Sequence, residues 1–458
     1  MKKETYSNEI LRIKRHKKHL KKSKSLKRRD RRFKLLKKLT KIKKFNGVAI
    51  VNSFISQEIN SANCKNKHLE KKEKVKISLP SNFDIFSNTE DVIKKIIRIS
   101  EKILSPGLND IIIDHRNVIK SSLSSESLFG LLLTEVVSNR RKQLNERISV
   151  RGFFPKRHGA VKSIVEKIGI VRELINDDPF SDADENNHDS NVHYFRYDNR
   201  YSQSVSVKDD KKRKVAEGCV AYLETCMNAH RLTIKKEAQD RLRACLGEVF
   251  DNAEEHCGRT RPVWFVRGYF NEIENESDRY LELSVFNLGN SISENFSSLP
   301  EKSQIKNIAH NYVQRHLSSS KENALYTVAA LQGQVSTKKD LDPTRGQGTV
   351  TLIETFESIY QAYTNLRAPG ENRVKAQMNL ISGDTVIVFD GTYQSKVVEL
   401  EDGSETFQMP FNTNQTLQSP PDTKKVYTMK DAWFPGVMIS IRIPLQGSTE
   451  PLRGDSNE

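Results

Sequence analysis

Apolar residues recur along residues 75–176 at spacings that predict alternating strands and helices. Residues 75–79 alternate apolar and polar side chains, as a strand with one buried face does, and residues 110–114 (Asp-Ile-Ile-Ile-Asp) are an apolar run typical of a buried strand. Residues 89–104 place Ile and Val at helical spacing. Helices at 127–137 and 161–175 and a strand at 148–150 complete the pattern. This alternation predicts a small α/β domain.

A second α/β domain is predicted over residues 214–445. Its expected helices are 215–229, 232–257, 322–331 and 345–363, and its expected strands are 263–270, 280–286, 378–381, 385–390 and 434–445. The first two strands are expected to pair as a hairpin. Residues 392–432, rich in Asn, Gln, Pro and Thr, are an insertion for which a mobile surface loop is the default.

The length of the chain agrees with two domains. At 458 residues it exceeds what one hydrophobic core usually supports. Residues 46–74 and 177–213 have the polar composition of linkers, and residues 446–458 form a tail. The aromatic run at 194–197 in the second linker is a candidate for docking on a neighbouring surface.

The positive charge is concentrated in an arm, residues 1–45. The arm holds 21 Lys and Arg residues against three acidic residues, a net of +18, whereas the whole chain carries +17, so residues 46–458 carry a net of −1. Such a segment can order on an acidic partner. Nucleic acid is the favoured class, because neutralising phosphates requires no particular fold. An anionic membrane surface, or a tail that only aids solubility, is the alternative.

Cysteine usage and hydropathy predict a cytoplasmic protein. The five cysteines form no CxxC pair, which suits a reducing compartment and argues against a zinc site. No apolar run reaches the length of about 18 residues that a transmembrane segment needs. The basic N-terminus lacks the apolar region of a secretory signal.

Two polar residues on one predicted helix are the first candidates for chemistry. Residues 242–258 place apolar side chains at three- and four-residue steps. Glu248 and Asn252 are four residues apart, so they project from nearly the same side. A carboxylate one turn from a carboxamide can hold a hydrated Mg²⁺ and orient a proton acceptor near it. The alternative is a polar stripe on an ordinary amphipathic helix.

Two glycine-containing segments follow this helix. The strand at 280–286 runs into the turn Asn-Leu-Gly-Asn-Ser-Ile at 287–292, where Gly289 permits close approach of the backbone to a ligand. Residues 345–349, Arg-Gly-Gln-Gly-Thr, open a predicted helix, and glycine amides at a helix N-terminus can cradle a phosphate. A single Gly-x-Gly is commoner as a plain loop, but its position after the other two segments favours a site.

The order of these segments resembles the GHKL (Bergerat-fold) ATPases. "EVFDNAEEH" is similar to their N-box, Glu-x-x-x-Asn-Ala-x-x-His, and closest to that of the anti-sigma-factor serine kinases. "VFNLGNSI" is similar to the G1 box, usually Asp-x-Gly-x-Gly-Ile, and "VSTKKDLDPTRGQGT" is similar to the lid and the Gly-x-Gly box. The resemblance covers about residues 215–445. It implies a two-layer α/β sandwich, with a mixed sheet covered by helices on one face, that binds ATP and Mg²⁺.

The resemblance also implies roles for individual residues. Glu248 is expected to polarise the attacking nucleophile, Asn252 to ligate Mg²⁺, and Lys338 to neutralise charge on the γ-phosphoryl group. The residues expected to contact the nucleotide are Asn252, Asn287, Gly289, Ser336, Thr337, Lys338, Arg345, Gly346, Gln347, Gly348 and Thr349. Two positions depart from the family pattern. The adenine-binding Asp is Asn287 here and the second G1 glycine is Ser291, so the specificity for adenine is open.

The first domain resembles the STAS domain of anti-sigma-factor antagonists, through "IIIDHRNV", "ISVRGFFP" and "VEKIGIVREL". In that family a phosphorylated serine begins the helix after the second of these strands. The turn here reads Ser121-Ser122-Leu123-Ser124-Ser125-Glu126-Ser127, without the family's Asp-Ser pair. A helix N-cap accounts for serine there at least as well as phosphorylation does, so no phosphoacceptor is assigned.

Three functions remain open at this point. The first is an ATP-hydrolysing regulatory switch, in which a lid at about 320–348 closes on the phosphates and alters how the STAS-like module, the arm or a second protomer docks. The second is a serine kinase that acts on itself or on a STAS-like partner. The third is a non-catalytic scaffold tethered to nucleic acid. The expected partners are nucleic acid through residues 1–45, a protein through the STAS-like domain, and a second copy in a homodimer.

Overall fold

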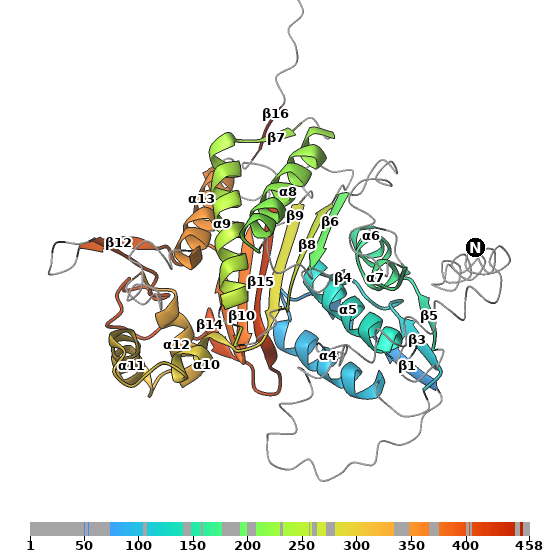
Figure 1. The fold of residues 1–458 in the computed structure, drawn as a ribbon, viewed down its shortest axis with the longest axis horizontal. Helices are drawn as coiled ribbons and strands as arrows, with labels where there is room; N and C mark the ends of the chain where they lie inside the picture. Colours follow the sequence, from blue (N-terminus) through green and yellow to red (C-terminus); the bar gives the residue numbers. More distant parts are fainter. Residues whose placement is uncertain are drawn as a thin grey trace, which may run out of the picture. The chain divides into compact units, whose positions relative to one another are not determined.

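A computed structural model of the chain describes most of residues 74–451. The described residues are 50, 54, 74–103, 108–139, 141, 148–156, 159–175, 193–198, 208–229, 232–255, 257–258, 263–271, 280–333, 348–365, 375–399, 403, 405–444 and 449–451. They form a mixed α/β structure with helices and several sheets (Figure 1). The chain divides into two compact units, Met1–Asp84 with Lys94–Asp177, and Ile85–Ile93 with Asp178–Glu458.

The first unit is built on a three-stranded parallel sheet in the order β1-β3-β5. These strands are β1 (Lys74–Ser78), β3 (Asp110–Asp114) and β5 (Ser149–Phe153). Two short parallel strands are β2 (Asn82–Phe83) and β4 (Lys120–Ser121). The helices are α4 (Thr89–Ile103), α5 (Leu123–Asn139), α6 (Ala160–Lys167) and α7 (Ile170–Ile175), and α4 starts within the second unit. The predicted strands and the predicted helix at 89–104 are thus found within a residue or two, except that β5 extends beyond 148–150.

Two predicted helices of this unit have different bounds. α5 begins at Leu123 rather than at residue 127, because the serine run forms its first turn: the Ser125 amide donates to Ser122 Oγ at 3.4 Å. The predicted helix at 161–175 is two helices. The amides of Ile168 and Gly169 both donate to the carbonyl oxygen of Ile164, at 3.1 and 2.7 Å, which ends α6.

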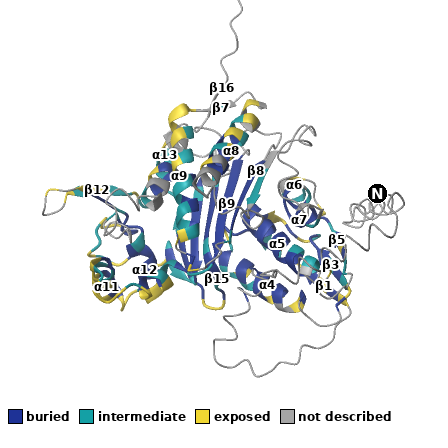
Figure 2. Cartoon of the chain, in the orientation of Figure 1, coloured by how far each residue is buried: buried dark blue, intermediate teal, exposed yellow. Residues whose placement is uncertain are grey.

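The second unit contains a seven-stranded sheet in the order β14-β11-β10-β15-β9-β8-β6. These strands are β6 (His193–Asp198), β8 (Val263–Asn271), β9 (Tyr280–Leu288), β10 (Gln377–Gly383), β11 (Thr385–Phe389), β14 (Val426–Thr428) and β15 (Phe434–Pro444). Two further pairs are β12 (Lys396–Glu399) with β13 (Glu405–Gln408), and β7 (Leu232–Ile234) with β16 (Thr449–Pro451). Most of the large sheet is buried (Figure 2).

Helices cover one face of this sheet. They are α8 (Lys208–Ala229), α9 (Lys236–Glu255) and α13 (Gly348–Asn365), and α9 packs against both of the others (Figure 1). Three shorter helices are α10 (Ile292–Ser297), α11 (Gln304–His316) and α12 (Glu322–Ala330). No described helix is both long and apolar enough to cross a membrane.

The observed sheet corrects three expectations. Every neighbouring pair is antiparallel, so the mixed sheet is not found: β9 and β10 run in the same direction, but β15 lies between them. The aromatic run at 194–197, predicted within a linker, is the edge strand β6. The insertion at 392–432 is not simply a surface loop, because it supplies β14 to the sheet and Phe407 and Phe411 to the core.

A short segment before and within the start of α4 is held by the second unit. Asn379 on β10 donates to the Ile85 carbonyl oxygen at 3.1 Å, and the Arg442 guanidinium lies 4.3 Å from the Phe86 ring centroid. The Glu90 carboxylate accepts from two backbone amides of the turn after β14. α4 continues from this segment into residues of the first unit.

Candidate functional site

One flank of helix α9 is anchored to β8, and the opposite flank carries the predicted pair, Glu248 and Asn252. The Phe250 ring stacks on Trp264 with 4.7 Å between centroids, and the Trp264 indole donates to Glu254 Oε1 at 2.9 Å. Asn252 precedes Glu254 by about 200° of helix rotation, so it lies on the opposite flank, with Glu248 one turn before it. Both side chains are partly exposed, whereas the anchoring Phe250 is buried. The helix therefore presents a carboxylate and a carboxamide together, as the spacing predicts.

Asn287 lies at the end of β9, on the face of the sheet that the helices cover. It pairs in register with Trp264 on β8 and Val437 on β15, and it alternates with the core residues Leu283 and Val285. The residue is 6% exposed. Its carboxamide makes no hydrogen bond to any described residue, and its polar atoms are not sealed from solvent, so both its donor and its acceptor can pair with a ligand.

The turn after Asn287 is joined to the chain that follows α9. The Asn290 amide donates to the Cys257 carbonyl oxygen at 2.9 Å. Gly289 has φ +153°, and a Cβ there would lie 2.0 Å from the same oxygen. A Cβ added at Gly258 would lie 2.3 Å from Asn290 Nδ2. The close approach that Gly289 permits is thus made by protein backbone, and it fixes the end of α9 beside the turn.

Ser291 has a local structural role. It is the N-cap of α10: its Oγ accepts from the Glu294 amide at 3.3 Å, and its own amide donates to Glu294 Oε2 at 2.7 Å. This is a capping box, and its signature, Ser-x-x-Glu, stands in the sequence at 291–294. The helix that Ser291 begins therefore explains a serine at this position.

The segment predicted to contact phosphate lies largely outside the described residues. Ser336, Thr337, Lys338, Arg345, Gly346 and Gln347 all fall there, as does much of the predicted lid. Gly348 is the first residue of α13, and Thr349 lies in its first turn, so the helix predicted to open in this segment is present. The first amides of a helix have no partner within it and carry a partial positive charge, which suits a phosphate. α13 packs along α9, the helix that carries Glu248 and Asn252.

The described residues offer few ligands for a metal ion. They contain no group of three or more His, Cys, Asp or Glu residues that could hold one. Mg²⁺ commonly keeps several waters and is bound through one or two protein oxygens together with substrate phosphates. The Asn252 carboxamide beside the Glu248 carboxylate fits that kind of site, and does not fit a cage made by the protein alone.

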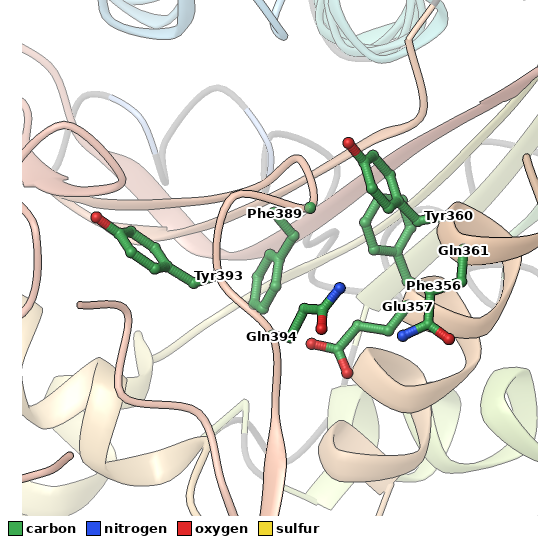
Figure 3. Close-up of a pocket in the computed structure, with 8 residues that line it drawn as sticks. Phe356, Glu357, Tyr360, Gln361, Phe389, Tyr393 and Gln394 are labelled. Atoms are coloured by element: carbon green, nitrogen blue, oxygen red, sulfur yellow. The ribbon is translucent and has the colours of Figure 1, made fainter. Parts of the chain in front are cut away.

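A small cavity lies elsewhere in the second unit, between α13 and the turn after β11 (Figure 3). Its volume of about 10 Å³ suits one water molecule. The lining residues are Phe356, Glu357, Tyr360, Gln361, Phe389, Gly391, Tyr393 and Gln394. Glu357 accepts from the Ser395 amide at 2.7 Å and from its hydroxyl, and burial raises the pKa of the Glu357 carboxyl. The cavity is too small for a nucleotide.

The serine run of the first unit is buried. Ser121, Ser122, Ser124, Ser125 and Ser127 are all at most 6% exposed. Ser121 Oγ donates to Glu126 Oε1 at 2.9 Å, and the other oxygen of Glu126 lies 3.3 Å from His115 Nε2. Because the serine and the histidine both contact the carboxylate and not each other, the cluster is a buried polar network and not a nucleophile–base pair.

Comparison of the chain with family models, with curated proteins and with solved structures gives no match in any of the three.

Proposed function

We propose that the second unit binds ATP with Mg²⁺ in the manner of the GHKL ATPases and acts as a regulatory switch coupled to a STAS-like module. The observation that carries the proposal is the Asn287 carboxamide, nearly buried and without a hydrogen bond to a described residue, beside the end of the helix that bears Glu248 and Asn252. A base edge that offers a donor and an acceptor could pair with both groups of this carboxamide.

Each residue then has a task that follows from its chemistry. Asn287 contacts the base, and Asn252 supplies an oxygen to the metal ion. Glu248 accepts a proton from the attacking water or hydroxyl. The N-terminus of α13 carries a partial positive charge that favours a bound anion. Gly346 and Gly348 are therefore the expected phosphate contacts. Mg²⁺, when bound, neutralises charge on the phosphate oxygens.

The kinase alternative meets an obstacle within this chain. The serines that correspond to the family's phosphoacceptor are buried, so a kinase can reach them only after the first turn of α5 opens. A STAS-like domain on another chain is not subject to this obstacle. Hydrolysis is therefore the reaction that we propose first.

Nucleotide binding is tested by calorimetric titration of the full chain with ATP, and separately with GTP, in excess Mg²⁺. Asn252→Ala and Asn287→Ala should each weaken ATP binding at least tenfold. Asn307→Ala, an exposed substitution on α11, is the matched control and should bind as wild type does. The proposal is wrong if neither nucleotide binds wild-type protein, or if all three variants bind alike.

The reaction is tested with γ-labelled ATP. We expect label in free phosphate, at a rate that Glu248→Gln lowers by about 10²–10⁴. Label on serine that disappears in the same variant would establish the kinase instead. Tight ATP binding with no release of label would leave a nucleotide-regulated scaffold.

A further inference from the structure

The parallel sheet of the first unit leaves one face open. Along β1 the buried residues Val75 and Ile77 alternate with the exposed Lys74, Lys76 and Ser78. Parallel sheets are almost always covered on both faces. On this face the half-buried Ile112 lies between Lys76 and Arg151 in the pairing register, and charged side chains surround it.

On the open face the basic side chains are more exposed to solvent than the acidic side chains that they contact. Asp110 and Asp114 are the centres of two clusters, and their side chains are only 17% and 9% exposed. Around Asp110 lie the Lys74 ammonium at 3.9 Å and the Arg151 guanidinium, which are 60% and 48% exposed. The outer layer is therefore cationic, although the acidic residues lie in the same clusters.

The second cluster repeats the arrangement further along the sheet. Asp114 Oδ2 lies 3.1 Å from the Lys76 ammonium and 2.6 Å from Arg116 Nη2, and these basic side chains are 52% and 36% exposed. The Arg116 guanidinium also lies 4.5 Å from the centroid of the Phe153 ring. The pairing register places Lys76 and Arg151 in one row across the three strands. The cations of the two clusters thus lie along one face of the sheet.

Each aspartate carboxylate binds one arginine, and N–H donors of that arginine remain available for other partners. Arg151 uses Nε and Nη2 to bind Asp110, and Arg116 uses the same two nitrogens to bind Asp114. Each guanidinium has five N–H donors, so about three remain on each. A guanidinium that is already oriented loses less entropy when it binds a phosphate, and its planar fork suits phosphate geometry.

We infer that this face, formed by Lys74, Lys76, Arg116 and Arg151, binds the phosphate backbone of single-stranded nucleic acid. Charge complementarity requires a polyanion, and a pleated sheet face bearing positive charge is a surface along which a flexible strand can lie. The arm of net charge +18 precedes β1 in the chain and favours the same class of partner. An anionic membrane fits less well, because only the last dozen residues of the arm have an amphipathic pattern.

The test is fluorescence anisotropy of a labelled single-stranded 20-mer, titrated with full-length protein over a range of salt concentrations. Lys74→Glu with Lys76→Glu should weaken binding at least tenfold and reduce the slope of log affinity against log salt by about 1.4, for two lost phosphate contacts. Lys302→Glu with Lys424→Glu makes the same change of charge at exposed lysines of the second unit and should alter binding less than threefold.

Three results would overturn the inference. The first is wild-type affinity for the 20-mer in the Lys74/Lys76 variant. The second is an equal loss of affinity in the Lys302/Lys424 variant. The third is a Lys74/Lys76 variant that loses binding to phosphatidylserine vesicles but not to the 20-mer. Because Lys76→Glu places a second carboxylate beside Asp114, the neutral pair Lys74→Gln with Lys76→Gln is measured too, and its thermal melt is compared with that of wild type. The inference requires that the Glu pair and the Gln pair at Lys74 and Lys76 both weaken binding to the 20-mer.

Discussion

At the scale of single residues, Gly289 is where the turn after β9 meets the chain that leaves α9. A Cβ at this position would lie 2.0 Å from the Cys257 carbonyl oxygen, and φ is +153°. We therefore expect Gly289→Ala to lower the free energy of unfolding by roughly 2 kcal/mol or more. Urea denaturation measures this change.

A matched glycine separates this strain from a general effect of alanine. Gly218 is an exposed residue of α8 with no heavy atom within 4 Å of an added Cβ. Gly218→Ala should stabilise the protein by up to about 1 kcal/mol, because alanine favours the helix. If both substitutions changed stability in the same direction, the contact at Gly289 would not be as close as described.

A second residue makes stability depend on pH. Burial raises the pKa of the Glu357 carboxyl above 4.5, and hydrogen bonds from Ser395 offset only part of this effect. The folded protein then holds the proton to a higher pH than the unfolded chain does. The contribution of Glu357 to stability is therefore present below its unfolded pKa and is lost as the pH rises through the folded pKa.

Glu357→Gln should remove this dependence. Relative to the variant, wild-type protein should lose stability as the pH rises above the ordinary titration range of a carboxyl group, as measured by urea denaturation at intervals of one pH unit. The exposed Glu399→Gln substitution on β12 is the control and should leave the pH dependence of the wild-type protein in place. A constant difference for Glu357→Gln would mean that its carboxyl is not desolvated.

At the scale of elements, local signals predicted what local interactions decide. The apolar spacing placed Glu248 and Asn252 on one flank of α9, and the glycines at 346 and 348 marked the start of α13. β6 was missed because its partner, β8, lies some 70 residues later in the chain, as the register of Arg196 with Arg267 shows. The same limit applies to Gly289, whose neighbour Cys257 is brought near only by the packing of α9 on the sheet.

The insertion at 392–432 shows a different limit. Phe407, Met409 and Phe411 alternate with other residues, but the alternation is short and contains Pro410, so it gives only a weak strand signal. All three residues are buried in the core of the second unit. Side chains that reach the core from one short strand and the irregular backbone after it can be recognised only once the core itself is known.

α10 offers a prediction at this scale. Ser291→Ala removes the N-cap oxygen of this helix and should cost about 1 kcal/mol, whereas Ser291→Gly should cost only a few tenths. Thermal denaturation of the two variants gives the comparison. A Ser291→Gly variant that is less stable than Ser291→Ala would show that capping is not what selects serine at this position.

At the scale of the whole molecule, the two compact units predict how the binding of a ligand would change thermal unfolding. Each has its own sheet, and the residues proposed to bind nucleotide all belong to the second unit. A ligand that binds one folded unit stabilises that unit alone unless the two unfold together. We therefore expect differential scanning calorimetry of the full chain to give two transitions.

Mg²⁺ and ATP at about one hundred times the dissociation constant should stabilise one of these transitions by about 2.7 kcal/mol, which corresponds to a rise of roughly 4–5 °C for a unit of this size. The transition that rises must be the one that Gly289→Ala lowers, because that substitution marks the second unit. Asn252→Ala should leave both transitions in place and reduce the response to nucleotide by about half or more, as a loss of affinity of at least tenfold requires. A single transition would mean that the units unfold cooperatively, whereas two transitions that both ignore ATP would contradict the proposed function while leaving the division into units intact.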